Sequence, residues 1–266
     1  MTVVCVENVW KSYSDQTVLE NINFVAEPGS FISLVGPSGC GKSTFLRMLL
    51  GDEAPSKGTI LIDGVPLQAE PSPDRGVVFQ RYSVFPHLSA LENVMLGLEF
   101  GASPVTGRLF GRARRGAREA SMEMLKSVGL EAASKKYPSE LSGGMQQRLA
   151  IAQALIKKPK ILLLDEPFGA LDPGIRAEVH EILLKLWHET AMTIFMVTHD
   201  LSEAFKLGTR VIAFDRRRNR PEELKAYGAT ITFDLKVDGK TPPVARPTAP
   251  ISDMAPALSL GTLAAV

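Results

Sequence analysis

The sequence predicts an α/β fold with a mostly parallel sheet, an N-terminal antiparallel β sub-domain and an inserted α-helical sub-domain. Apolar, strand-like runs alternate with helix-like segments towards the end of the chain, as expected of parallel strands joined by helical crossovers. A block with helical spacing interrupts this pattern in the middle. With 266 residues, 45% of them hydrophobic, the chain can bury a full core in one domain that carries an insertion.

Strands dominate the first third of the chain. Residues 3–9 are apolar with polar interruptions and residues 21–26 alternate, as half-buried strands do. Residues 31–35 predict a buried strand that leads into a glycine-rich loop. Residues 59–62 predict a strand that enters a hairpin turn at residues 63–64.

The middle of the chain is predicted to be helical. Residues 88–98 and 119–128 carry apolar residues at helical spacing, and residues 145–156 predict a third helix that Pro159 ends. Residues 101–116 are rich in glycine and arginine, and they predict either a surface loop or a short extra helix.

The last part returns to the α/β pattern, with an edge strand at its end. We expect one domain over residues 1–237, with its helical sub-domain at about residues 84–157. Residues 238–266 contain repeated prolines and are expected to form a mobile tail. The predicted elements of this part are strands at 161–164, 193–197, 211–214 and 230–237, and helices at 175–190 and 201–207.

Composition narrows the classes of protein to consider. The formal net charge of +1 gives no sign of a bulk polyanion partner, although it leaves room for a local basic patch. The two cysteines, Cys5 and Cys40, favour a reducing compartment. The N-terminus lacks the long apolar run of a secretory signal, and no stretch approaches the ~18 apolar residues of a membrane span. We expect a soluble chain, so that any membrane span belongs to another protein.

A phosphate-binding loop is the most specific motif. It fits G-x-x-x-x-G-K-[ST], follows a predicted strand and opens a helix at about residue 45. The alternative is an ordinary glycine-rich turn. Such a turn does not require a strand before it and a helix after it, whereas a phosphate loop does. Lys42 is expected to reach the β- and γ-phosphates of a nucleotide, and the Ser43 hydroxyl to ligate Mg²⁺. The motif comprises Gly36, Pro37, Ser38, Gly39, Cys40, Gly41, Lys42, Ser43 and Thr44.

Two acids follow the apolar strand at residues 161–164. The carboxyl ends of parallel strands carry the ligand site of such sheets, so Asp165 and Glu166 are expected beside the phosphate loop. Asp165 would hold Mg²⁺ and Glu166 would polarise the attacking water. Taken alone, the segment could equally be a strand followed by a charged turn.

A second anion cradle is predicted at the start of another helix. Ser142, Gly143 and Gly144 supply a hydroxyl and backbone N–H groups at that helix start. The alternative is a plain N-cap by Ser142, but a cap does not require two glycines, which cost helix stability. One nucleotide needs one cradle, so the second makes sense if it completes the site of another subunit.

These motifs together resemble the nucleotide-binding subunit of ATP-binding cassette (ABC) transporters. The resemblance covers about residues 1–236 and rests on an ordered set of motifs. It implies a P-loop NTPase core, ATP and Mg²⁺ as cofactors, and ATP hydrolysis. The motifs are the phosphate loop, Gln80, Leu141–Arg148, residues 164–167, Leu171 with Asp172, and His199.

The resemblance also implies roles for single residues. The subunits pair head to tail, so that the ATP on one phosphate loop meets Ser142, Gly143 and Gly144 of the other subunit. Tyr13 matches the aromatic residue that stacks on adenine, and Asp172 matches the loop that communicates across the dimer. Gln80 matches the glutamine that touches Mg²⁺, and His199 matches the residue that contacts the γ-phosphate.

The stretch after Gln80 and the stretch before Leu141 resemble bacterial importer subunits of the nitrate/sulfonate/taurine group, with a narrower resemblance to the sub-family linked to urea or guanidine derivatives. This implies a transmembrane permease partner, a second ATPase subunit that is a copy of the chain and forms a homodimer with it, and a periplasmic or lipoprotein solute-binding protein. It also implies a peripheral location on the cytoplasmic face of the inner membrane.

Two alternatives stay open, namely an exporter and a soluble ATPase of the same superfamily that acts on nucleic acid. The arginines near residues 101–118 predict a solvated loop, or a surface that touches lipid headgroups or the membrane partner.

Overall fold

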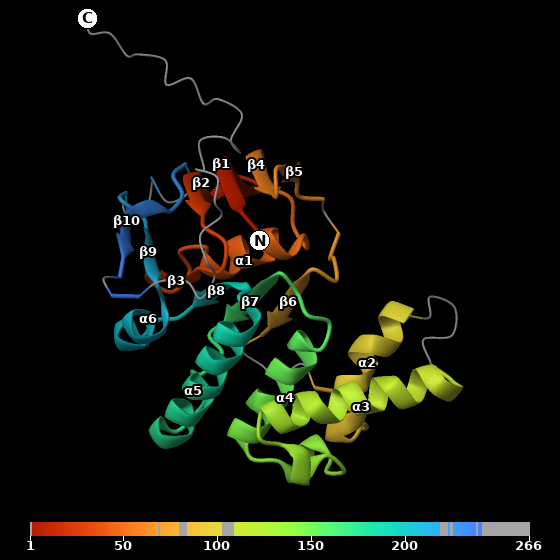
Figure 1. Ribbon diagram of the computed structural model, residues 1–266. Helices are drawn as coiled ribbons and strands as arrows, with labels where there is room; N and C mark the ends of the chain where they lie inside the picture. Colours follow the sequence, from red (N-terminus) through yellow and green to blue (C-terminus); the bar gives the residue numbers. More distant parts are fainter. Residues whose placement is uncertain are drawn as a thin grey trace, which may run out of the picture.

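The computed structural model describes residues 2–68, 70–79, 84–102, 109–218, 223, 226–237 and 239–240. Within them the chain forms a four-stranded sheet with the order β2-β1-β4-β5 and a six-stranded sheet with the order β10-β9-β3-β8-β7-β6. A block of helices extends from the larger sheet (Figure 1). The predicted fold class is confirmed. The predictions for Gln80 and for the tail after residue 240 lie outside the described residues.

The smaller sheet is the predicted antiparallel β sub-domain. It consists of β1 (Val4–Tyr13), β2 (Gln16–Ala26), β4 (Lys57–Ile62) and β5 (Val65–Pro66). Alternate residues of β1 are buried, including Val4 and Val6, because one face of the sheet packs on the core. β1 runs four residues beyond its predicted end, since shifts in its register with β2 carry the pairing on to Tyr13.

The larger sheet carries five parallel strands. These are β3 (Phe31–Val35), β6 (Arg75–Val78), β7 (Ile161–Asp165), β8 (Thr193–Val197) and β9 (Arg210–Asp215). β10 (Thr230–Lys236) lies at one edge, as predicted, and pairs antiparallel with β9. The sequence did not predict β6, because its four residues include an arginine and a glycine and show no clear apolar run.

Helix α1 (Lys42–Leu50) lies between the two sheets (Figure 1). Its buried residues Phe45, Met48 and Leu49 share one core with the inner faces of both sheets. The opposite face of the larger sheet packs on a second core, to which α5 (Pro173–Thr190) contributes. α6 (Leu201–Leu207) follows β8 and packs near β3. The start of α1 is therefore held rigidly at the edge where the parallel strands end.

The helical block comprises α2 (Ala90–Ala102), α3 (Gly111–Ser127) and α4 (Gly143–Leu155), with 3-10 turns at Glu131–Ala133 and Pro138–Glu140. α3 starts eight residues before the predicted helix, so residues 111–116 are helical and exposed rather than part of a loop. Its first turns carry Arg112, Arg114 and Arg115. No helix among the described residues is both long and apolar enough to cross a membrane.

Candidate active site

The phosphate loop connects the carboxyl end of β3 to the start of α1. Gly36, Gly39 and Gly41 have positive φ angles of 143°, 78° and 97°, which glycine adopts without the strain of a side chain. At Gly36 a Cβ atom would also lie 2.1 Å from the carbonyl oxygen of Phe214. Gly41 caps α1 without a side chain and the first turn carries no acid, so no capping side chain or acid of that turn competes with an anion for its N–H groups.

Lys42 lies inside this loop. Its side chain is buried, and its Nζ atom donates to the carbonyl oxygens of Gly36 and Pro37 at 2.8 Å each. The positive charge therefore lies against the backbone of the loop, on the wall of an open pocket of about 360 Å³. The pocket is lined by Val18, Ser38, Gly39, Gly41, Lys42, Ser43, Thr44, Arg47 and Glu166.

Ser43 and Asp165 meet as predicted. The Ser43 hydroxyl donates to Asp165 Oδ1 at 2.9 Å, joining α1 to the end of β7. Burial raises the pKa of Asp165 above its ordinary value, and the nearby Glu166 raises it further, while the hydrogen bond from Ser43 opposes both. A half-buried carboxylate beside a hydroxyl offers the oxygen ligands that Mg²⁺ prefers. A bound cation would also offset the free-energy cost of burying the negative charge of Asp165. The residues present therefore fit Mg²⁺.

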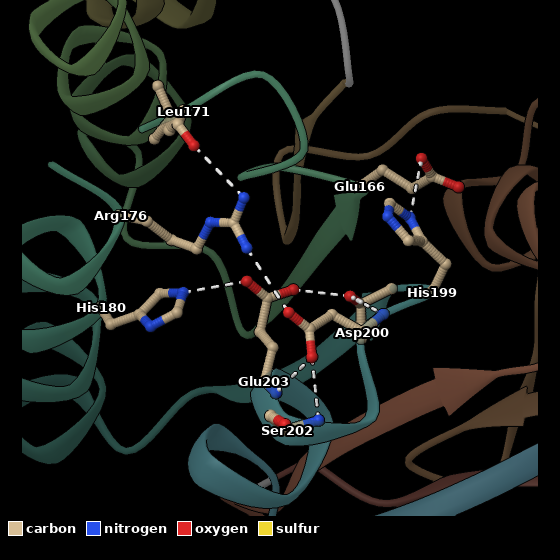
Figure 2. A network of polar contacts seen from close by, with 9 residues as sticks. Glu166, Leu171, Arg176, His180, His199, Asp200, Ser202 and Glu203 are labelled. Carbon is tan, nitrogen blue, oxygen red and sulfur yellow. Dashed lines mark hydrogen bonds and ion pairs between the residues drawn. The ribbon is translucent and has the colours of Figure 1, made fainter. Parts of the chain in front are cut away.

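Glu166 and His199 form a second pair at the same edge of the sheet. Glu166 Oε2 lies 3.5 Å from His199 Nδ1, and the two residues follow β7 and β8 (Figure 2). The Glu166 backbone has a φ of 45°, which is unfavourable for a residue other than glycine, and its N–H donates to Val197 O at 3.0 Å. The neighbouring strand thus holds the strained turn that directs the Glu166 side chain into the pocket.

Tyr13 lies at the end of β1 with 42% of its surface exposed. Its hydroxyl donates to Glu53, and the Lys11 Nζ atom lies 4.9 Å from the centre of its ring. Burial raises the pKa of Tyr13, as does the hydrogen bond to Glu53. The residues that line the pocket do not include Tyr13. They do include Arg47, which the sequence did not lead us to predict. Arg47 lies one helical turn after Ser43, and this spacing could have indicated it.

The other predicted site residues lie on different elements. Ser142 caps α4, accepting from the Met145 N–H at 3.3 Å, so the plain capping interaction is present. Ser142 and Gly143 are exposed, whereas Gly144 is buried. Asp172 is exposed at the start of α5, and its side chain makes no capping hydrogen bond there. None of these four residues lines the pocket at the phosphate loop.

A network of polar contacts that the sequence did not predict lies behind His199 (Figure 2). Asp200 and Glu203, at the start of α6, accept hydrogen bonds from side chains of α5. Their partners on α5 are Arg176 and His180, as Figure 2 shows. An aspartate followed three residues later by a glutamate is a helix-start signal, so the sequence could have indicated the cap but not its partners.

Comparison with known proteins places these features in one family. The profile of the family described as ABC transporter matches residues 19–169. The aliphatic sulfonates import ATP-binding protein SsuB of Bacillus cereus is 41% identical over 213 residues, which are 79% of this chain and 80% of that protein. The bicarbonate transport ATP-binding protein CmpD of Synechocystis is 43% identical over 211 residues, 78% of this chain and 72% of that protein.

Solved structures agree with this. The ATP-binding cassette MJ0796, in a dimeric post-hydrolysis state bound to ADP and Pi, superposes with a TM-score of 0.71 at 33% identity. The match covers 89% of this chain and 100% of that one. A second dimeric structure of MJ0796 gives a TM-score of 0.72 over the same shares of the two chains.

Proposed function

The chain belongs to the ABC transporter family, and from that premise we propose that it is the ATP-hydrolysing subunit of a bacterial importer for a small solute. The observation that carries the proposal is one pocket lined by the phosphate loop and Glu166, in which the lining residue Ser43 also donates to Asp165 at 2.9 Å. The names of SsuB and CmpD, both proteins of uptake or transport, support the importer assignment over the nucleic-acid alternative.

Each residue that the sequence predicted for the site has a proposed task. The N–H groups of the loop and Lys42 bind the phosphates, with Lys42 exchanging its contacts to Gly36 and Pro37 for phosphate oxygens. Mg²⁺, held by Ser43, Asp165 and Gln80, would neutralise charge on the β- and γ-phosphates. Glu166 accepts a hydrogen bond from the attacking water and orients it towards the γ-phosphate. His199 contacts the γ-phosphate from the end of β8, and Tyr13 stacks on adenine.

A second copy of the chain would complete the site. The exposed Ser142 and Gly143, with Gly144 behind them, would bind the γ-phosphate held by the opposite subunit, and Asp172 would lie at the contact between the two subunits. The dimeric state of MJ0796 supports this arrangement. ATP would then join the subunits, and its cleavage would remove the bridge and favour opening.

The same proposal names the assembly around the chain. A transmembrane permease would couple closure and opening to transport, and a periplasmic or lipoprotein solute-binding protein would deliver the solute. The chain would lie on the cytoplasmic face of the inner membrane. Affinity purification of the tagged chain from detergent-solubilised native membranes tests this. Co-elution of a multi-span protein is expected, whereas nucleic acid without any spanning protein would revive the soluble alternative.

Glu166→Gln tests the catalytic assignment. The amide keeps the size of the side chain but accepts a proton from water far less well, so turnover should fall at least a hundredfold while ATP is still bound. The variant should also elute as an ATP-dependent dimer in size-exclusion chromatography. Glu178→Gln, the same change at an exposed position of α5, serves as the control and should turn over ATP normally. Parental turnover by Glu166→Gln would rule out Glu166 as the base.

A further inference from the structure

Two residues on one face of α5 link the two loops that carry the catalytic candidates, one by direct contact with both loops and the other through Glu203 of α6. Arg176 and His180, four residues apart and therefore on the same side of the helix, are here called the α5 clamp. The first loop, residues 166–172, carries Glu166. The second, residues 198–200, carries His199. Figure 2 shows the clamp on one side and the Glu166–His199 pair on the other, with Asp200 and Glu203 between them.

Arg176 forms the outer half of the clamp. Its guanidinium donates to the carbonyl oxygen of Leu171 at 3.2 Å, in the first loop. It also donates to Asp200 Oδ2 at 3.4 Å, in the second loop. The other oxygen of Asp200 accepts from the backbone N–H groups of Ser202 and Glu203, at 2.9 and 3.2 Å, so Asp200 is fixed at the start of α6.

His180 forms the inner half. Its ring packs edge-on against Phe168, in the first loop, with the ring centres 4.5 Å apart. Its Nε2 atom lies 3.0 Å from Glu203 Oε1, and the other oxygen of Glu203 accepts from the Thr198 hydroxyl at 2.5 Å. His180 and Glu203 are both more than 90% buried. A buried carboxylate must be hydrogen-bonded to be tolerated, so this inner half is a fixed contact.

His199 depends on these neighbours for its position. Its side chain is 64% exposed, and its polar contact among the described residues is the one to Glu166 at 3.5 Å. In contrast, the residues on both sides of it in sequence, Thr198 and Asp200, are hydrogen-bonded to each other. Asp200 also accepts from Arg176, and Thr198 donates to Glu203, the partner of His180. The backbone on either side, rather than packing of the ring, therefore sets where the imidazole lies.

We propose that Arg176 and His180 are positioning residues for ATP hydrolysis, which hold the Glu166 loop and the His199 loop at a fixed separation from one face of α5. The inference rests on the proposed function, because the separation matters to catalysis only if Glu166 and His199 act on ATP. α5 begins next to Asp172, so a displacement at the subunit contact would reach both loops through this helix.

Arg176→Met is the better test, because removing His180 would leave Oε1 of the buried Glu203 without its partner and destabilise the whole fold. The variant should lower kcat about tenfold or more, since a misplacement of about 1 Å is enough for that, and should leave KM for ATP within about twofold. Lys185→Met, the same change at an exposed position of α5 whose ion pair to Glu189 spans 3.9 Å, should leave kcat unchanged. In a His199→Ala background, Arg176→Met should lower kcat less than it does in the parent, because only its effect through the Glu166 loop remains. A loss there as large as in the parent would overturn the proposal, because Arg176 would not be acting through His199.

Imidazole ¹H–¹⁵N spectra of the full chain give a readout that needs no turnover. Arg176→Met should shift the His199 signals and leave those of His188, at the far end of α5, in place. Lys185→Met should leave the His199 signals in place. Unmoved His199 signals in Arg176→Met would overturn the inference even if the parent hydrolyses ATP. Shifted signals in a chain that does not hydrolyse ATP would instead refute the proposed function and leave the positioning geometry standing.

Discussion

Gly144 has a packing role that can be measured apart from any contact with nucleotide. A Cβ atom at this position would lie 2.1 Å from Ile175 Cγ2, whereas carbon atoms in ordinary contact are about 3.5–4.0 Å apart. In Gly144→Ala the Ile175 side chain, or the start of α5 with it, must therefore move by more than about 1 Å relative to α4. Overpacking of this kind costs about 1–3 kcal/mol, which lowers Tm by roughly 2–10 °C in a domain of this size.

Thermal unfolding of a double-mutant cycle measures this cost. Ile175→Ala removes Cγ2, and the remaining Cβ atom would lie 3.6 Å from the new methyl group, an ordinary contact. Gly144→Ala combined with Ile175→Ala should therefore lose at least about 1 kcal/mol less stability than the sum of the two single variants. Additive losses would refute the reasoning, since they would show that α4 and α5 do not meet at this pair.

The remaining predictions concern the pocket. Asp165→Asn should raise Tm at neutral pH in nucleotide-free protein, because the raised pKa of Asp165 means that its ionised form destabilises the native state. The difference in Tm between the variant and the parent should shrink as the pH falls through the raised pKa towards the ordinary range of an aspartate. Thermal unfolding measured between neutral and acid pH tests this, and a difference in Tm that stayed constant would contradict it. Lys42→Ala removes a charge held 2.8 Å from two loop carbonyl groups, and should weaken ATP binding at least about tenfold by calorimetric titration. An unchanged Kd would exclude Lys42 from phosphate binding.

The sequence predicted those parts of the fold whose signals are local. The buried strands β3 and β8 appear at their predicted bounds, because an uninterrupted apolar run needs no knowledge of its neighbours. The short strand β6 escaped prediction, since its place in the sheet depends on pairing with β7. The start of α3 was not predicted at its observed position either, because exposed arginines and glycines give no periodic signal.

The candidate site shows the same division. A motif in one stretch of chain predicted the phosphate loop, and strand polarity predicted the approach of Asp165 to Ser43. No spacing in the sequence indicates that Arg176 would reach Asp200, since that contact depends on how α5 lies across the sheet. The sequence does not indicate the packing of Gly144 on Ile175 either, since each residue also fits an ordinary helix start.

The order of strands in the larger sheet also determines at which stage of protein synthesis the site can form. β3, β8 and β7 are neighbours in space, but the phosphate loop follows residue 35 while the acids and His199 come some 130 to 165 residues later. A ribosome-bound chain that has completed the loop must wait for most of the domain before Ser43 can meet Asp165. Nucleotide can therefore stabilise only the late stages of folding, and a premature stop before β7 leaves a phosphate loop with no acids beside it.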